Sequence, residues 1–237
     1  MVELVAGVEG KGIPDGLPAG RQARSRGVSF EASTDGNEPE TGPATRLKNF
    51  GIELLNMKFY KVSWKELETD CFALYKKIKK YKFDRILCVS RGGLVWARMF
   101  SDLLGNLPIS HLTAVSYTGI HKQKNVEITE LPEHKKLNNQ TLLVIDEIAD
   151  HGKTFAKVKE YLRTLKIKKY YTLAPIIRTY IKPRPDFYLK IIDDWIIYPY
   201  ELKETYKAFL KIYKTKEKAL KMLLKNGFKE DNFKGLF

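Results

Sequence analysis

Residues 142–155, LLVIDEIADHGKTF, constrain the fold more than any other part of this chain. Four apolar residues run directly into the carboxylates Asp146 and Glu147, and a helix-like segment follows from about Thr154. A short, branched apolar run of this kind is typical of a buried strand. Because ligands of open α/β sheets bind at the carboxyl ends of strands, both carboxylates are predicted to lie at a ligand site.

The turn after the acidic pair, residues 150–154, has the composition of a phosphate-binding loop. Gly152 permits a tight turn, and Thr154 offers a hydroxyl donor where the helix begins. Free backbone N–H groups and the helix dipole favour an anion at such a position. A nucleoside-triphosphate P-loop is the obvious alternative, but its first glycine would fall on Glu147. The pattern fits a phosphate monoester better, with the two nearby carboxylates accepting hydrogen bonds from hydroxyl groups of the ligand.

Strand-like and helix-like segments alternate along residues 57–201. This alternation predicts an α/β fold with a mostly parallel central sheet flanked by helices. Strands are expected at residues 83–90, 109–118, 140–147, 168–177, 187–192 and 195–201, and helices at residues 63–81, 94–105 and 154–166. Residues 119–140 are polar and are expected to form a long, lid-like connection.

The two ends of the chain differ from this central domain in composition. Residues 1–56 are rich in glycine and proline and lack an apolar period, so we expect a disordered extension. Residues 202–237 form a basic extension with one amphipathic helix, or a pair of helices, that stops near Gly227. Its apolar stripe predicts packing on the domain or on a second subunit, and the alternative is a helix that lies on a membrane or on RNA.

The formal net charge of +14 indicates either anionic partners or a lysine-rich, ion-paired surface. Charge alone does not distinguish phosphorylated metabolites from nucleic acid or a membrane surface. Cys71 and Cys88 lack the CxxC spacing of a metal or redox site, and we expect buried thiols in a reducing compartment. No apolar run reaches the roughly 18 residues that span a bilayer, and no signal peptide is recognisable, so a cytoplasmic location is expected.

These motifs together resemble the type I phosphoribosyltransferase family, and within it the purine enzymes of the xanthine-guanine and hypoxanthine-guanine type. VIDEIADHGKT is similar to the phosphoribosyl-pyrophosphate signature of the family, and SRGGL, residues 90–94, is similar to its pyrophosphate loop. SYTG, residues 116–119, lies where its mobile loop begins, and PDF followed by WIIYPYE, residues 195–201, resembles its purine-binding end. The resemblance covers residues 58–201, in the order and spacing of the family. It implies the type I phosphoribosyltransferase fold with a small base-binding hood.

The resemblance implies transfer of the 5-phosphoribosyl group from phosphoribosyl pyrophosphate to a 6-oxopurine base in purine salvage, with release of pyrophosphate. It implies Mg²⁺ as the cofactor, with Glu147 on the metal side. The residues implied for phosphoribosyl pyrophosphate are Arg91, Gly92, Gly93, Asp146, Glu147, Asp150, His151, Gly152, Lys153 and Thr154. Those implied for the purine are Asp150, Arg178, Trp195 and Ile196, and Asp150 is the implied catalytic acid or base.

Two residues depart from the usual pattern of the family. His151 stands where a serine or threonine hydroxyl would donate to the phosphate, and an imidazole is larger and changes charge near neutral pH. Arg178 stands where a lysine usually faces the 6-oxo group of the base. A planar guanidinium fork is not equivalent to an ammonium, so the preferred purine is left open.

Two alternatives to a purine transferase remain open on the sequence. One is a non-catalytic regulator that senses phosphoribosyl pyrophosphate and binds nucleic acid through its basic surface. The other is a phosphoribosyltransferase for another base. The complete set of pyrophosphate, metal and purine residues favours the enzyme. We therefore expect phosphoribosyl pyrophosphate, a purine base and further copies of the chain as partners, and neither a membrane nor nucleic acid.

Overall fold

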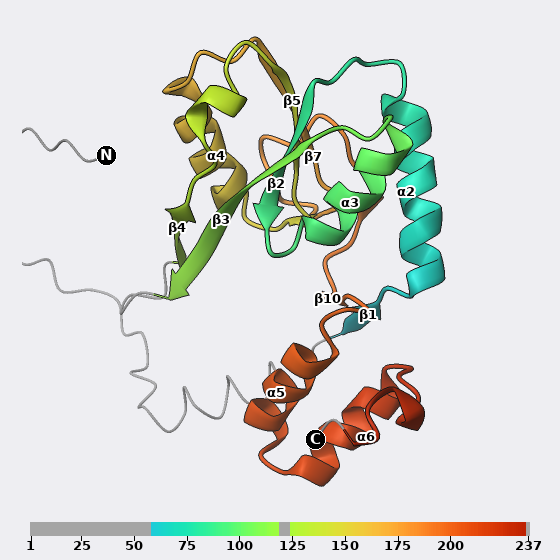
Figure 1. Cartoon of the computed structure of the whole chain (residues 1–237). Coiled ribbons are helices and arrows are strands. Elements are labelled where there is room, and N and C mark those ends of the chain that lie inside the picture. The colour runs from blue at the N-terminus through green and yellow to red at the C-terminus, as the bar shows by residue number, and fades with distance from the viewer. Residues whose placement is uncertain (1–57, 119–123, 236–237) are drawn as a thin grey trace, which may run out of the picture. The chain divides into compact units, whose positions relative to one another are not determined.

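The protein is described by a computed structural model that covers residues 58–118 and 124–235 (Figure 1). The expected disordered extension at residues 1–56 lies outside this range. A five-stranded sheet has the order β4-β3-β2-β5-β7. Its strands are β2 (Arg85–Ser90), β3 (Ile109–Thr118), β4 (Lys124–Glu130), β5 (Thr141–Ile145) and β7 (Lys169–Leu173). All run parallel except β4, which confirms the predicted α/β fold with a mostly parallel sheet.

Helices cover both faces of this sheet. Helices α2 (Trp64–Ile78) and α3 (Leu94–Leu103) lie on one side, and α4 (Lys153–Arg163) lies on the other (Figure 1). Side chains alternate between the two faces of a strand, so each central strand contributes to both cores. Ile86, Cys88, Leu143 and Ile145 belong to the core with α2 and α3, and Leu87, Val89, Leu142 and Val144 belong to the core with α4.

The connection after β3 differs from the expectation. The polar composition of residues 119–140 predicts a loop, but β4 pairs antiparallel with β3 between Thr113 and Thr118. The strand is short of apolar residues, since only Val126 and Ile128 carry its period of two. The composition of this polar edge strand is therefore similar to that of a lid-like loop, and the prediction of a loop at residues 124–130 is wrong. The expected mobile loop lies partly outside the described residues, because 119–123 are not among them.

Two smaller sheets follow the central one. Strands β6 (Ile148–Ala149), β8 (Ile176–Ile177) and β9 (Lys190–Ile191) form a three-stranded sheet, and β1 (Phe59–Lys61) pairs in parallel with β10 (Trp195–Ile197). The expected strand at residues 168–177 is interrupted before β8 at Pro175, which lacks the N–H that a ladder needs. The expected strand at residues 187–192 is reduced to β9.

The C-terminal residues form a pair of helices, α5 (Leu202–Tyr213) and α6 (Lys216–Lys225), followed by a short 3-10 turn, η2 (Glu230–Asn232). Their apolar sides meet in a cluster that also includes Phe59 of β1 and Ile197 of β10. This cluster consists of Phe59, Ile197, Tyr206, Phe209, Ala219, Leu223, Phe228 and Phe233 with partly buried neighbours. The helices therefore pack on the domain. Within the described residues, no helix has both the length and the apolar character to cross a membrane.

An ion cluster joins β9 to α2. The Nζ atom of Lys190 lies 2.7 Å from Oδ2 of the buried Asp70 and 2.5 Å from Oε1 of Glu66, and the Tyr60 hydroxyl also donates to Glu66. Partial burial alone would lower the pKa of Lys190, but the hydrogen bonds to both carboxylates outweigh it and raise that pKa. The cluster fixes a two-residue strand that has few contacts of its own.

We expect Lys190→Met to lower the free energy of unfolding by about 3 kcal/mol, because it leaves a buried carboxylate without its cation. Urea denaturation at pH 7 measures this loss. The matched control is Lys157→Met, which breaks an exposed pair of 2.9 Å with Glu160 on α4. That change should cost no more than about 0.5 kcal/mol. Equal losses in the two variants would contradict the prediction.

Candidate active site

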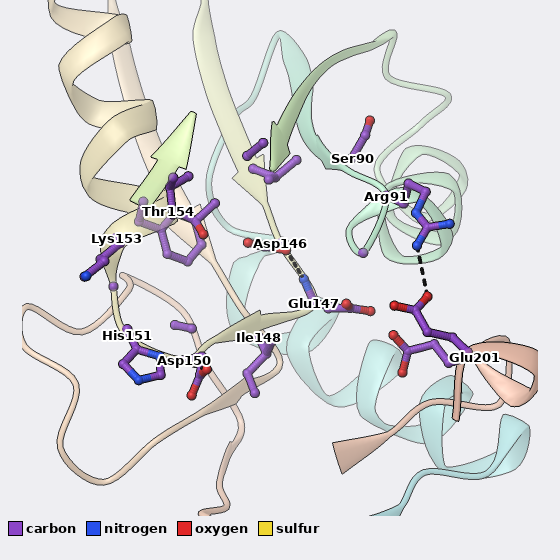
Figure 2. A pocket seen from close by; sticks show the side chains of 18 of the residues that line it. Ser90, Arg91, Asp146, Glu147, Ile148, Asp150, His151, Lys153, Thr154 and Glu201 are labelled. Carbon is purple, nitrogen blue, oxygen red and sulfur yellow. Dashed lines mark hydrogen bonds and ion pairs between the residues drawn. The ribbon is translucent and has the colours of Figure 1, made fainter. Parts of the chain in front are cut away.

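A pocket of about 520 Å³ lies at the carboxyl ends of β2 and β5 (Figure 2). Its volume falls within the range of about 300–1,000 Å³ that is usual for ligand sites. Every residue that the sequence implies for phosphoribosyl pyrophosphate lines it, with the exception of Gly93. The lining comes from the loop after β2, the acidic pair after β5, the loop before α4 and the start of α5. Segments far apart in the sequence thus meet where the strand pattern predicts a ligand.

The loop after β2 reaches the end of β5 because two glycines follow Arg91. A Cβ atom on Gly93 would lie 2.5 Å from the carbonyl oxygen of Ile145 and 2.9 Å from that of Val89. A Cβ atom on Gly92 would overlap the Glu147 carboxylate. The peptide bond between Ser90 and Arg91 is cis. The close approach of this loop to the acidic pair therefore requires glycine at position 93, where the neighbours are backbone atoms, and favours glycine at position 92.

The acidic pair is held in place by neighbouring donors. Asp146 Oδ1 accepts from the backbone N–H of Glu147 at 2.8 Å, and Glu147 Oε2 accepts from the Tyr200 hydroxyl at 2.7 Å. The Tyr198 hydroxyl donates to the Glu147 carbonyl at 2.7 Å. Burial raises the pKa of Asp146 to about 7, and burial together with the nearby Glu201 raises the pKa of Glu147 to about 8. A cation or hydroxyl donors entering the pocket would favour the ionised forms.

The raised pKa of Asp146 makes the stability of the ligand-free protein depend on pH. An aspartate in the unfolded chain has a pKa of about 3.9, so the folded state binds the proton more tightly. The resulting stabilisation is complete below about pH 4 and is lost as the pH rises through about 7. We expect Asp146→Asn, which cannot ionise, to have a higher Tm than the wild type at pH 8.5 and no such advantage at pH 5.

Thermal unfolding of metal-free protein at the two pH values measures this difference. Asp102→Asn is the control, because this exposed carboxylate at the end of α3 makes a long pair of 3.8 Å with Arg98. Its effect on Tm should be the same at both pH values. An Asp146→Asn effect that does not change with pH would contradict the prediction.

Asp150 lies in the loop before α4, and three hydrogen-bond donors hold its carboxylate. Its Oδ1 accepts from Arg178 Nε at 2.9 Å and from the Tyr180 hydroxyl at 3.0 Å, and its Oδ2 lies 2.8 Å from His151 Nδ1. Burial would raise the pKa of Asp150, but the hydrogen bonds from Arg178 and Tyr180 outweigh it and lower that pKa. The side chain is therefore an ionised carboxylate of fixed orientation, suited to accept a proton from a ligand.

Arg178 connects Asp150 to the segment that precedes β10. Its side chain is only 11% exposed, and Nη1 donates to the carbonyl oxygens of Ile192 at 2.9 Å and Asp194 at 2.6 Å. The family resemblance implies that Arg178 faces the purine base, but it does not predict these contacts. Because Nε and Nη1 are engaged, a ligand oxygen would have to approach Arg178 on the Nη2 side.

Trp195 and Ile196 lie on β10 and do not line the pocket. The Trp195 side chain is 49% exposed, and its backbone N–H donates to the Lys58 carbonyl at 2.9 Å. The Ile197 carbonyl accepts from the Val62 N–H at 2.9 Å. Since the polar backbone groups alternate in direction along a strand, those of Ile196 point away from β1. The phosphate residues are thus brought into one pocket, with Gly93 excepted, whereas Arg178, Trp195 and Ile196 lie outside its lining.

Three pocket residues, Tyr200, Glu201 and Glu204, are not predicted by the sequence patterns. Arg91 Nη2 lies 2.9 Å from Glu204 Oε2, the ion pair drawn from Arg91 in Figure 2. The two side chains are 80% and 67% exposed, so the pair contributes at most about 1 kcal/mol, and an anionic ligand can displace Glu204. The only sequence signal is that Glu201 ends WIIYPYE and that Glu204 follows at helical spacing.

A magnesium ion would need ligand oxygens to complete its coordination here. Among residues 58–118 and 124–235, no three His, Cys, Asp or Glu side chains are grouped as a metal site. Mg²⁺ commonly binds one or two carboxylates and completes its shell with water and substrate phosphate oxygens. Glu147, with Glu201 nearby, fits such a shared site.

Comparison with known proteins identifies the family. Residues 63–205 match the family model described as the phosphoribosyl transferase domain, and this match covers more than half of the 237-residue chain. The chain belongs to this family and is a transferase, as the sequence resemblance predicts.

Solved structures agree with this assignment. The chain is 28% identical to a purine phosphoribosyltransferase from Pyrococcus horikoshii, with a TM-score of 0.55 over 61% of this chain and 94% of that one. It is 25% identical to the xanthine-guanine-hypoxanthine phosphoribosyltransferase of Helicobacter pylori, with a TM-score of 0.55 over 62% of this chain and 96% of that one. The predicted type I phosphoribosyltransferase fold is therefore confirmed.

Proposed function

We propose that this transferase moves the 5-phosphoribosyl group from phosphoribosyl pyrophosphate to a 6-oxopurine, namely guanine, hypoxanthine or xanthine, and releases pyrophosphate. The proposal depends most on one observation: the acidic pair, the Arg91 loop and the start of α4 line a single pocket. The names of the Pyrococcus horikoshii and Helicobacter pylori proteins support a purine as the acceptor.

The start of α4 suits the 5-phosphate of the sugar. Gly152 has a φ of 72°, in the left-handed region, and α4 begins at the next residue. The backbone N–H groups of residues 151–154 and the Thr154 hydroxyl are the donors we assign to the phosphate, with Lys153 as the nearby positive charge. Asp146 and Glu147 accept hydrogen bonds from the ribose hydroxyls, which stabilise their ionised forms.

The loop after β2 suits the pyrophosphate group. Arg91 exchanges its exposed Glu204 partner for a pyrophosphate oxygen, and the backbone N–H group of Gly92 donates beside it. The N–H group of Gly93 already donates to the Val89 carbonyl at 2.9 Å. Glu147 would hold Mg²⁺ together with substrate oxygens and water. When bound, the ion would neutralise the negative charge that builds up on the departing pyrophosphate. Displacement of Glu204 therefore accompanies substrate binding.

Asp150 receives the proton of the purine. A purine nitrogen forms its bond to the anomeric carbon while the bond from that carbon to the pyrophosphate oxygen breaks. The imidazole N–H proton passes to the Asp150 carboxylate, which Arg178 and Tyr180 hold in position. Trp195 stacks on the base, the backbone of Ile196 meets its exocyclic edge, and Arg178 approaches the 6-oxo group through Nη2.

The cellular setting follows from this proposal. A transferase that joins free purines to an activated sugar phosphate belongs to cytoplasmic purine salvage. We also propose that it works as a homo-oligomer without a membrane or nucleic acid. Gel filtration with light scattering tests the assembly, and a monomer at micromolar concentration would contradict it.

The full chain, with Mg²⁺ and phosphoribosyl pyrophosphate, should be incubated separately with guanine, hypoxanthine, xanthine, adenine and uracil. Nucleotide and pyrophosphate are then measured together. We expect stoichiometric formation of both with at least one 6-oxopurine. Product with adenine or uracil alone would overturn the choice of base. No product with any base, together with a salt-sensitive shift of nucleic acid, would instead identify the sensing regulator.

A further inference from the structure

His151 lies in the loop assigned to the phosphate, but its imidazole ring contacts the base side of the site. Nδ1 lies 2.8 Å from Asp150 Oδ2 (Figure 2). The ring centroid is 5.9 Å from that of Tyr180. The side chain is 53% exposed, so the rest of the ring meets solvent. We assign its backbone N–H to the phosphate, whereas its side chain forms a hydrogen bond with Asp150.

The charge of Asp150 determines which ring nitrogen of His151 carries hydrogen. An ionised carboxylate can only accept hydrogen bonds, so Nδ1 must be the donor to Oδ2. In the neutral ring, Nε2 is then unprotonated.

The same contacts show which oxygen of Asp150 can receive the purine proton. A carboxylate offers about four lone-pair directions, two on each oxygen. Oδ1 uses both of its directions for Arg178 and Tyr180, whereas Oδ2 accepts from His151. The remaining direction is therefore on Oδ2, the oxygen that His151 holds. Proton transfer from the purine breaks its N–H bond and forms an O–H bond at this atom, and the Nδ1 hydrogen stays on His151.

We propose that His151 is a positioning residue for proton transfer, whose Nδ1–H hydrogen bond orients Asp150 Oδ2. This inference rests on the proposed function. Loss of the imidazole should therefore slow the purine step, and the binding of the sugar phosphate should be affected less.

Three variants separate this role from phosphate binding. His151→Asn keeps an N–H donor that cannot become charged, His151→Phe removes the donor, and His134→Phe is a control at a histidine in η1 (His134–Lys136), which does not line the pocket. We measure kcat and the KM of phosphoribosyl pyrophosphate at pH 8.5. Loss of a hydrogen bond to a charged group predicts a drop in kcat of about 10-fold or more for His151→Phe, with KM within about 3-fold.

His151→Asn should recover part of that kcat, whereas His134→Phe should match the wild type. A 10-fold rise in KM for His151→Phe, with kcat unchanged, would show that the ring binds phosphate and would overturn the inference. A kcat for His151→Asn as low as that of His151→Phe would overturn it as well. Failure of the proposed function is distinct, because the wild type would then form no nucleotide at all.

A measurement without turnover completes the test. Nitrogen NMR of protein labelled in histidine reports which ring nitrogen is protonated. We expect His151 to be in the Nδ1–H form at pH 8.5 and to lose that preference in Asp150→Asn. An Nε2–H ring in the wild type would contradict the inference whether or not the enzyme is active.

Discussion

Replacing Gly93 with alanine is expected to reduce kcat/KM for phosphoribosyl pyrophosphate by about 100-fold or more. The added methyl group would lie 2.5 Å from the Ile145 carbonyl oxygen and 2.9 Å from that of Val89. Both atoms belong to central strands, so the loop must move instead, and Arg91 moves with it. Such overpacking also costs about 1–3 kcal/mol of stability. Steady-state kinetics and urea denaturation of the variant measure the two effects.

Gly105→Ala is the matched control for this change. Gly105 follows α3 with a φ of 86°, and a Cβ atom there would meet nothing within 4 Å. Alanine in the left-handed region costs about 1 kcal/mol, so stability falls while the pocket is untouched. We expect kcat/KM to stay near the wild-type value. Gly93→Ala with wild-type kcat/KM would show that the loop does not depend on its contact with β5.

Asp150→Asn is expected to lower kcat by about 10²- to 10⁴-fold, the usual contribution of a positioned acid or base. The amide has nearly the same shape, and its oxygen can still accept from Arg178, but it cannot take the purine proton. The KM of phosphoribosyl pyrophosphate should change by less than about 3-fold, because the sugar phosphate depends on other residues. Single-turnover measurements with the preferred purine separate this chemical step from product release.

Asp193→Asn controls for the loss of a carboxylate close to Arg178. Asp193 accepts hydrogen bonds from the backbone N–H and the hydroxyl of Thr179, and it does not line the pocket. Its replacement should leave kcat nearly unchanged. An Asp150→Asn enzyme within 10-fold of the wild type would assign the proton transfer to another group or to water.

The parts of the site that the sequence predicts are contiguous. A strand, Asp146, Glu147 and a glycine turn before a helix lie within fourteen residues, and each has a local pattern that indicates its structure. Strand β4 is not predicted from the sequence, because only Val126 and Ile128 alternate with polar residues in that segment. A local pattern is reliable only where enough apolar residues repeat.

The contacts that join distant segments have no local pattern. Lys190 meets Asp70 across 120 positions of the chain, and Arg91 meets Glu204 across 113. In the same way, Arg178 donates to Asp150 from 28 positions along the chain and is itself held by the Ile192 carbonyl. Sequence analysis places these residues on elements, but only the packed structure shows which charges meet.

The helix pair α5 and α6 also affects how the gene tolerates premature termination. A stop codon directly after Glu201 would spare nearly all of the residues matched by the family model. The truncated product would nevertheless lack Glu204, which lines the pocket, and would expose the apolar side chains of Phe59 and Ile197 to water. Such a product is expected to aggregate, so a nonsense mutation at codon 202 should cause loss of function.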